Sequence, residues 1–179
     1  MAIIYPEGTQ SYPAGIIQVR SNIQRSPIYG QNQQNQWQTM FTWNSAMTLK
    51  AANSIVWLMG SANTNVTGGS VGHFWRWQYS TNGSTWSWFG QEPSSYGNRV
   101  AVHFSMRNNG YQDDILRTPV IFHSNNWAAG TTLHFRLQSY QISGASPLLL
   151  NVAGQNDGNN NNNSQRGVTT TMAFELQNP

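Results

Sequence analysis

The chain has 179 residues, with 38% hydrophobic residues, eight Trp, seven Tyr and seven Phe, which is enough for one domain with a sizeable core. Its formal net charge is only +3, the basic residues are scattered, and no apolar run could span a bilayer, which argues against nucleic-acid and membrane partners. Cysteine is absent, which excludes thiol catalysis, disulfides and cysteine-ligated zinc.

The first segment, residues 1–14, contains Pro6, Gly8 and Pro13, which disfavour both a helix and a central strand. We therefore expect an extended N-terminal arm, followed by a single β-sandwich domain over residues 15–179. The chain does not open with a basic region and a long apolar stretch, so a secretory signal is not expected.

Alternation of apolar and polar residues dominates the rest of the chain, and helical periodicity is missing. This alternation predicts half-buried antiparallel strands near residues 15–22, 37–50, 54–60, 98–106, 118–124, 131–142, 147–152 and 168–176. Their apolar faces are predicted to carry Phe41, Trp43, Met47 and Leu49, then Ile55, Trp57 and Met59, then Val102, Phe104 and Met106, and then Leu133, Phe135 and Leu137. So many strands without a helix predict an all-β fold, an antiparallel β-sandwich of jelly-roll type.

The clearest local signal is the dipeptide Asn82-Gly83 between two aromatic runs. This dipeptide readily adopts the positive φ angles of a two-residue turn. Residues 73–81 are therefore predicted to pair with residues 84–89 in a hairpin.

Five large aromatic residues are concentrated in this hairpin. Trp75, Trp77 and Tyr79 share one face of the first strand, and Trp86 and Trp88 are candidates to pair with them across the turn. Exposed rings would stack on sugars, as in a carbohydrate-binding module, whereas buried rings would pack within the sheet or at a trimer axis. We favour burial, because five exposed large aromatic side chains would promote aggregation.

Few side chains suit catalysis. Among the six carboxylates, the adjacent Asp113 and Asp114 would point to opposite faces of a strand, so they are better explained by a turn. The four histidines lack the spacing of a zinc site and are better explained by cross-strand or subunit contacts. We predict no catalytic residue, no metal and no cofactor, and we expect that the chain is not an enzyme.

Two polar segments, residues 22–36 and 154–166, interrupt the strand pattern. The first is expected to be a long loop or an edge extension. The second contains five consecutive asparagines, Asn159–Asn163, next to Asp157. It lacks the alternating carboxylates of a calcium loop, so we expect a hydrated tip of the last hairpin.

Several short sequence segments, in the order in which they follow one another, resemble those of a family of small virion proteins of marine phages and cyanophages. These segments are MAIIYPEGTQSYPAGIIQV, WQYSTNGSTWSWFG, GNR, LRTPV, HFRLQSY and LLLNVAGQND followed by SQRGVTTTMAFEL. The resemblance covers nearly the whole chain. It implies a jelly-roll-like sandwich that forms homotrimers on the particle, as a capsid decoration or cement protein or as a short fibre, and it brings no catalytic motif.

Together these observations predict a non-enzymatic virion protein that is assembled in the host cytoplasm. Its simplest form is a homotrimer that decorates or cements the head by docking its N-terminal arm on the major capsid protein or a neighbouring virion protein. The alternative is a receptor-binding fibre tip or lectin-like module that binds host surface glycans through exposed Trp and Asn side chains. In the first hypothesis the capsid contacts are made by Ile3, Ile4, Tyr5, Pro6 and Tyr12.

Overall fold

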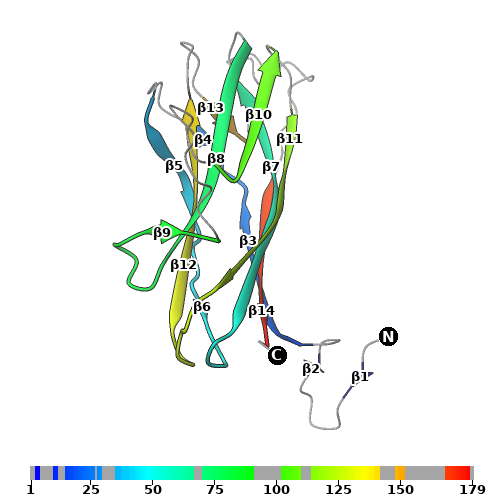
Figure 1. The fold of residues 1–179 in the computed structure, drawn as a ribbon. Coiled ribbons are helices and arrows are strands. Elements are labelled where there is room, and N and C mark those ends of the chain that lie inside the picture. Colours follow the sequence, from blue (N-terminus) through cyan, green and yellow to red (C-terminus); the bar gives the residue numbers. More distant parts are fainter. Residues whose placement is uncertain are drawn as a thin grey trace.

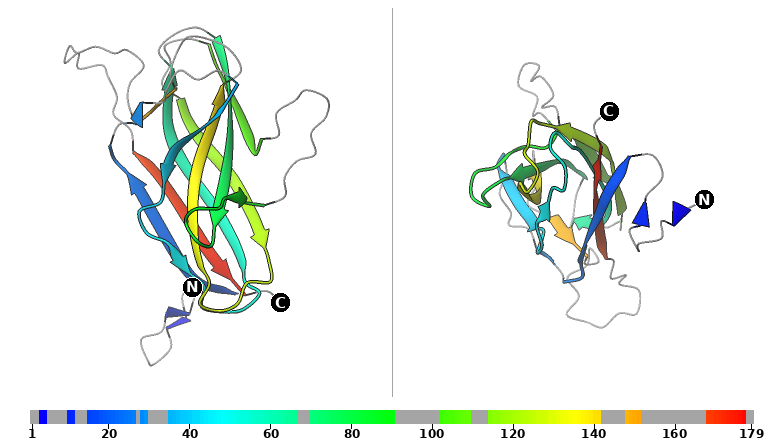
Figure 2. Two further views of the ribbon diagram at one scale, coloured as in Figure 1. Left: turned by 90° about the vertical axis from the view of Figure 1, so that its left-hand side faces the viewer. Right: turned by 90° about the horizontal axis from the view of Figure 1, so that it is seen from below.

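The structure is a computed structural model in which strands are packed into two facing sheets (Figures 1 and 2). It describes residues 3–4, 10–11, 15–26, 28–29, 35–66, 70–90, 102–109, 114–141, 148–151 and 168–177. All regular elements in these ranges are strands, and none of the described residues forms a helix that is long and apolar enough to cross a membrane.

One sheet, here called the β8–β12 sheet, has β8 and β12 at its centre. The short strand β9 pairs with β8 beside β10, and the short strand β6 pairs with β12 beyond β5. In spatial order its main strands are β10 (Phe104–Asn109), β8 (Ser70–Ser80), β12 (Thr132–Gln141) and β5 (Trp37–Thr42), and its short strands are β9 (Ser87–Trp88) and β6 (Met47–Thr48).

The other sheet, here called the β7–β14 sheet, is built around the long strand β7. One edge of β7 pairs with β11, and the other pairs with β14 along its first half and with β13 near its end. Its strands are β3 (Ile16–Gln24), β4 (Ile28–Tyr29), β7 (Ile55–Val66), β11 (Asp114–Ser124), β13 (Leu148–Leu150) and β14 (Thr169–Leu176).

The chain crosses between the sheets as a jelly roll does. Strands β3, β7, β11 and β14 belong to one sheet, while β5, β8, β10 and β12 belong to the other. The first long strand, β3, pairs with the last, β14. This pairing and those of β10 with β8, β12 with β5 and β8, and β14 with β7 are all antiparallel. This order confirms the predicted all-β sandwich of jelly-roll type.

The hydrophobic core lies between the two sheets. Leu133, Phe135 and Leu137 of β12 point inward and are fully buried, as their alternation predicts. The ring of Phe135 packs edge-on against Trp43 at 5.0 Å and against Phe89 at 5.6 Å. Because each fully buried large side chain contributes about 1.5–3 kcal/mol, these layers supply much of the stability of the sandwich.

The core also encloses a carboxylate, Glu175 of β14, which is fully buried. It accepts hydrogen bonds from the backbone N–H groups of Lys50 and Ala51, both at 2.9 Å. It also accepts bonds from the Ser54 hydroxyl at 2.7 Å and from the Gln18 side-chain amide. A buried charge with this many donors is well compensated, and it ties the connection between β6 and β7 to the last strand.

Several strands differ in their bounds from the predictions. The strand expected over residues 118–124 is β11 and begins already at Asp114, and the strand expected over residues 98–106 is β10 (Phe104–Asn109), with residues 98–101 outside the described residues. The strand expected over residues 37–50 is interrupted between Thr42 and Met47, where the backbone N–H of Asn44 donates to Oδ1 of Asn22 at 3.3 Å. The strand expected over residues 54–60 instead runs to Val66, because β11 and β13 pair with its polar second half.

The hairpin that follows β8 forms, but its turn is longer than the predicted two-residue turn. In the observed register Tyr79 pairs with Ser87. Within the described residues Gly83 has a positive φ of 73° and Asn82 does not. The Asn82 Oδ1 accepts the backbone N–H groups of Ser84 at 2.9 Å and Thr85 at 2.8 Å, which favours a wider, side-chain-capped turn.

A hydrogen-bonded neck joins the ends of the segment 152–167. Asn151 is buried and has a positive φ of 61°. Its Nδ2 donates to the carbonyl of Gln24 at 2.9 Å, and its Oδ1 accepts from the Thr169 hydroxyl at 2.8 Å. Residues 154–166, which include the predicted Asn-rich tip, lie outside the described residues.

The N-terminal segment contributes two short strands, β1 (Ile3–Ile4) and β2 (Gln10–Ser11). They pair with each other in an antiparallel sheet of their own, so the described part of the arm pairs with itself (Figure 1). The predicted contact residues Tyr5, Pro6 and Tyr12 lie outside the described residues, and the capsid-docking role of the arm stays a prediction.

Candidate binding surfaces

The five aromatic residues of the hairpin are divided between the two faces of the β8–β12 sheet. Trp75 and Trp77 are fully buried within the subunit, and Tyr79 packs against the same core. Trp88 lies opposite Gln78 in the ladder, on the outer face, and Trp86 is also half-buried over that face.

The longer turn explains this division. A two-residue turn at Asn82-Gly83 would place Trp88 opposite Trp77, on the inner face. The observed register is shifted by one residue, which places Trp88 opposite Gln78. A one-residue shift moves every side chain of the pairing strand to the other face, so the expectation that Trp86 and Trp88 join Trp77 on one face is wrong.

Arg76 of β8 lies between two aromatic rings on this outer face. Its guanidinium carbon is 4.0 Å from the ring centroid of Trp37 and 5.0 Å from that of Trp88. Its Nε–H donates to Oε1 of Gln138 on the neighbouring strand at 2.8 Å. Cation–π contact and a charge-assisted hydrogen bond therefore hold the guanidinium in place.

Arg136 of β12 makes the same kinds of contact, two residues further along the β8–β12 ladder. Its guanidinium carbon is 4.3 Å from the ring centroid of Trp86, and its Nε–H donates to Oε1 of Gln78 at 2.8 Å. Partial burial lowers the pKa of Arg136, but the group remains a cation at neutral pH. Gln78 and Gln138 are almost entirely buried, so their role is to position the two arginines.

We call this surface the arginine–tryptophan face and define it by Trp37, Arg76, Trp86, Trp88 and Arg136. The cross-strand pairs Arg76–Gln138 and Arg136–Gln78 are register partners, so each strand presents one arginine and one glutamine. A sequence reading could have placed Arg76 and Gln78 together on the outer face, because they alternate with the tryptophans of β8. Their partners on β12 follow only from the register of the two strands.

His103 lies at the border of this face, with its ring 4.8 Å from that of Trp88. Its Nδ1 accepts the backbone N–H of Trp77 at 2.9 Å. Burial, followed by the nearby charge of Arg76, lowers the pKa of His103 to about 4. His103 is therefore neutral at physiological pH, and the positive charge of the face comes from its arginines.

The outer face of the β7–β14 sheet is different, because it carries a row of apolar side chains. Phe122, Trp57, Phe174 and Val19 are successive register partners across β11, β7, β14 and β3. The rings of Phe122 and Trp57 meet edge-on at 4.8 Å, yet Phe122 is 54% exposed.

A second apolar row lies next to the first. Met59 and Met172 are register partners, and each is 37% exposed. Ile23, on the same side of β3, is 46% exposed. We call the surface formed by Val19, Ile23, Trp57, Met59, Phe122, Met172 and Phe174 the apolar face.

The sequence analysis placed the core side of β7 incorrectly. It expected Ile55, Trp57 and Met59 to face the core, whereas Val56 and Leu58 are the fully buried residues. Both faces of this strand are apolar, so alternation alone could not decide which one points inward. The buried partner Ala173 on β14 identifies the side of Leu58 as the inner one.

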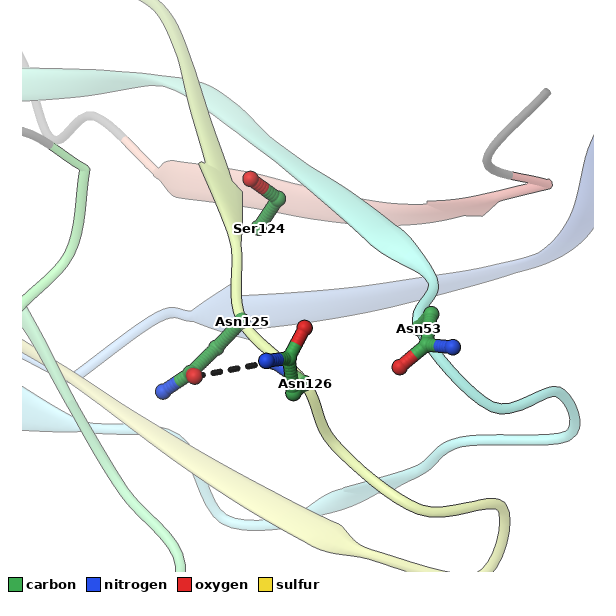
Figure 3. Close-up of a pocket in the computed structure, with 4 residues that line it drawn as sticks. All are labelled: Asn53, Ser124, Asn125 and Asn126. Atoms are coloured by element: carbon green, nitrogen blue, oxygen red, sulfur yellow. Dashed lines mark hydrogen bonds between the residues drawn. The ribbon is translucent and has the colours of Figure 1, made fainter.

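A separate polar pocket of about 260 Å³ is lined by Asn53, Ser124, Asn125 and Asn126, whose side chains Figure 3 shows. Asn53 has a positive φ of 56°, and its backbone N–H donates to the carbonyl of Trp127 at 2.8 Å. Asn125 Oδ1 accepts the backbone N–H of Asn126 at 2.8 Å. Neutral amides and a hydroxyl line the pocket, and the part of the chain that the structure describes contains no cluster of metal-ligating side chains.

No family model matches the chain, and no curated protein matches its sequence. Among solved structures the chain is similar to the VP2 subviral particle of infectious bursal disease virus, with 12% identity and a TM-score of 0.40, covering 100% of this chain and 46% of that chain. It is also similar to a chain in the structure of the Gx strain of that virus, with 12% identity and a TM-score of 0.37. That match covers 97% of this chain and 41% of the other chain. The chain spans less than half the length of these two chains.

Proposed function

We propose that this chain is a structural protein of a virus particle, and more specifically a phage decoration or cement protein that forms a homotrimer. The observation that carries the proposal is the apolar face, where Met59 and Met172 remain exposed on the central strands β7 and β14 and Phe122 remains exposed on the adjoining strand β11. A contiguous apolar surface of this kind is typical of a protein–protein contact. A virion assembled from many copies would cover it.

In this proposal the apolar face is the contact between subunits of the trimer. The N-terminal arm makes the second contact, with the major capsid protein, through Ile3, Ile4, Tyr5, Pro6 and Tyr12. Ordering such an arm on the shell costs about 1 kcal/mol or more for each backbone residue, so it requires a substantial surface in return. The role is structural, and the resemblance of the sequence to small phage virion proteins supports it.

Sedimentation equilibrium tests the subunit contact. The wild-type chain is expected to sediment as a trimer, and the double variant Phe122→Ser/Met172→Ser as a folded monomer. Val168→Ser is the matched control, because Val168 is similarly exposed at 47% but lies before the first residue of β14. A monomeric wild-type chain, or a trimer that tolerates the double variant, would contradict the proposal.

Cryo-electron microscopy of intact particles tests the location. Density for this chain at regular positions of the capsid lattice, with residues 1–14 over the shell, is the expected result. A chain that lacks residues 1–14 should remain a folded trimer and no longer bind capsids. Density found only at a tail or fibre tip, or wild-type capsid affinity without the arm, would refute decoration through the arm.

A further inference from the structure

We propose that the arginine–tryptophan face is a binding site for acidic saccharides, that is, glycans whose sugar rings carry a carboxylate. The surface lies on the sheet opposite the apolar face, so the inference does not depend on the trimer or on the position of the chain in a particle. It rests on the chemistry of the rings, the cations and the hydroxyl groups that the β8–β12 sheet brings together.

The rings supply stacking surfaces. Trp37, Trp86 and Trp88 are each half-buried, so part of each indole is in contact with solvent. The C–H face of a pyranose ring packs on an indole, which has a large apolar surface. The guanidinium contacts of Trp86 and Trp88 hold these rings in fixed positions, which reduces the entropy lost when a sugar binds.

The cations supply recognition of a carboxylate. The hydrogen bond to Gln78 uses the Nε of Arg136 and leaves the two terminal nitrogens as further donors. A carboxylate can accept two parallel hydrogen bonds from a guanidinium. Glu175, the carboxylate whose side chain the structure describes, is buried inside the sandwich and hydrogen-bonded there, so it does not neutralise this face.

Hydroxyl groups border the arginines. Thr42 is the register partner of Arg136 on the edge strand β5, and it is exposed. Thr39, also exposed, accepts a hydrogen bond from Nε2 of Gln138 at 3.1 Å. Saccharide hydroxyls both donate and accept hydrogen bonds, so these threonines complement the rings and cations.

A single-stranded nucleic acid could also use tryptophan and arginine side chains. Nucleic-acid affinity, however, depends on several phosphate contacts at once. This face has two arginines, and the whole chain has a formal net charge of +3. The guanidinium of Arg136 suits the single carboxylate of an acidic sugar better than a run of phosphates.

Affinity electrophoresis tests the inference with three uronate-containing polysaccharides, here called polyuronates, namely polygalacturonate, alginate and hyaluronan. The intact wild-type chain should be retarded by at least one of them and not by neutral galactan. Arg136→Gln and Trp86→Ala should each weaken the retardation at least about tenfold, because each removes a charge-assisted or stacking contact. Trp86 lies outside the strand ladder, so its variant is expected to fold, and a melting curve checks both variants.

Arg20→Gln is the matched control, because it removes the same charge from an exposed position on β3 of the other sheet. Wild-type retardation of this control is the expected result. The inference is overturned if no polyuronate retards the wild type, if galactan retards it equally, or if Arg20→Gln weakens binding as much as Arg136→Gln. It is also overturned if an oligothymidylate binds more tightly than every polyuronate.

Discussion

The outer faces of the two sheets differ in the contacts that their large aromatic side chains make. On the arginine–tryptophan face Trp37 and Trp88 lie over the charge of Arg76, and the buried side-chain amide of Gln138 helps to hold that charge in place. On the apolar face the rings of Phe122 and Trp57 contact each other, and more than half of the Phe122 side chain is exposed to water. The difference teaches that the large side chains of the first surface are held by contacts within one subunit, whereas those of the second leave apolar area exposed to water, as the contact surfaces of many proteins do. Four changes test this contrast, from the largest expected effect to the smallest.

The largest effect on the free energy of unfolding is expected from a change to Glu175, in the core between the two sheets. Glu175→Gln replaces one of the two carboxylate oxygens with an N–H₂ group beside the N–H groups of Lys50 and Ala51. We expect a loss of about 4 kcal/mol in the free energy of unfolding, because buried donors lose a charged acceptor. Urea denaturation measures it. A loss below about 1 kcal/mol would show that the carboxylate is not required to hold this connection.

Acid should weaken the sheet under the arginine–tryptophan face. The pKa of His103 is lowered from 6.5 to about 4 in the folded chain, so between these values the unfolded chain binds more protons. Stability from the neutral ring is therefore present above pH 6.5 and falls by up to about 3 kcal/mol as pH drops to 4. Urea titrations across this range measure the slope.

The control for this slope is His103→Gln, whose stability should depend less on pH. Burial also lowers the pKa of His123, which accepts the N–H of Gly90 at 3.0 Å and gives a slope of the same sign. An unchanged slope in His103→Gln would assign the whole effect to His123 or to carboxylates.

A smaller effect is expected from Trp37→Ala. The variant loses the contact with Arg76 and the ring contacts with Trp88 at 6.4 Å and Tyr140 at 5.3 Å. These contacts lie within one subunit, so unfolding of the monomer should be easier by about 2 kcal/mol. Chemical denaturation at low protein concentration measures the change.

The smallest effect on the monomer is expected from Phe122→Ala. The Phe122 ring is more than half exposed and contacts Trp57 edge-on, so its removal should cost about 0.5 kcal/mol under the same conditions. A monomer destabilised more by Phe122→Ala than by Trp37→Ala would reverse the comparison of the two faces.

The architecture could be predicted from the sequence where alternation is strong. The pattern of β12 correctly identified Leu133, Phe135 and Leu137 as core residues. Alternation failed in β7, because apolar residues occupy both of its faces and only the facing sheet determines which side is buried. The apolar face could therefore not be recognised before the pairing of β7 with β14 was known.

The arginine–tryptophan face was missed for a different reason. Its rings come from β5, from β9 and from the turn before β9. They meet only through the pairing of β5 and β8 with β12 and through the register of the β8–β9 hairpin. The Asn82-Gly83 signal correctly predicted the hairpin but gave a turn too short to produce that register. A local change of one residue therefore decided which face carries Trp88.

The neck formed by Asn151 and Thr169 has a practical consequence. Both residues are buried, and their side-chain hydrogen bond joins the chain on either side of the segment 152–167. Because the conformational cost of closing a chain segment grows only slowly with its length, residues added between Asn151 and Thr169 should change the free energy of unfolding little as long as this hydrogen bond forms. A foreign peptide inserted between these two residues would then be displayed by a scaffold whose strands stay paired.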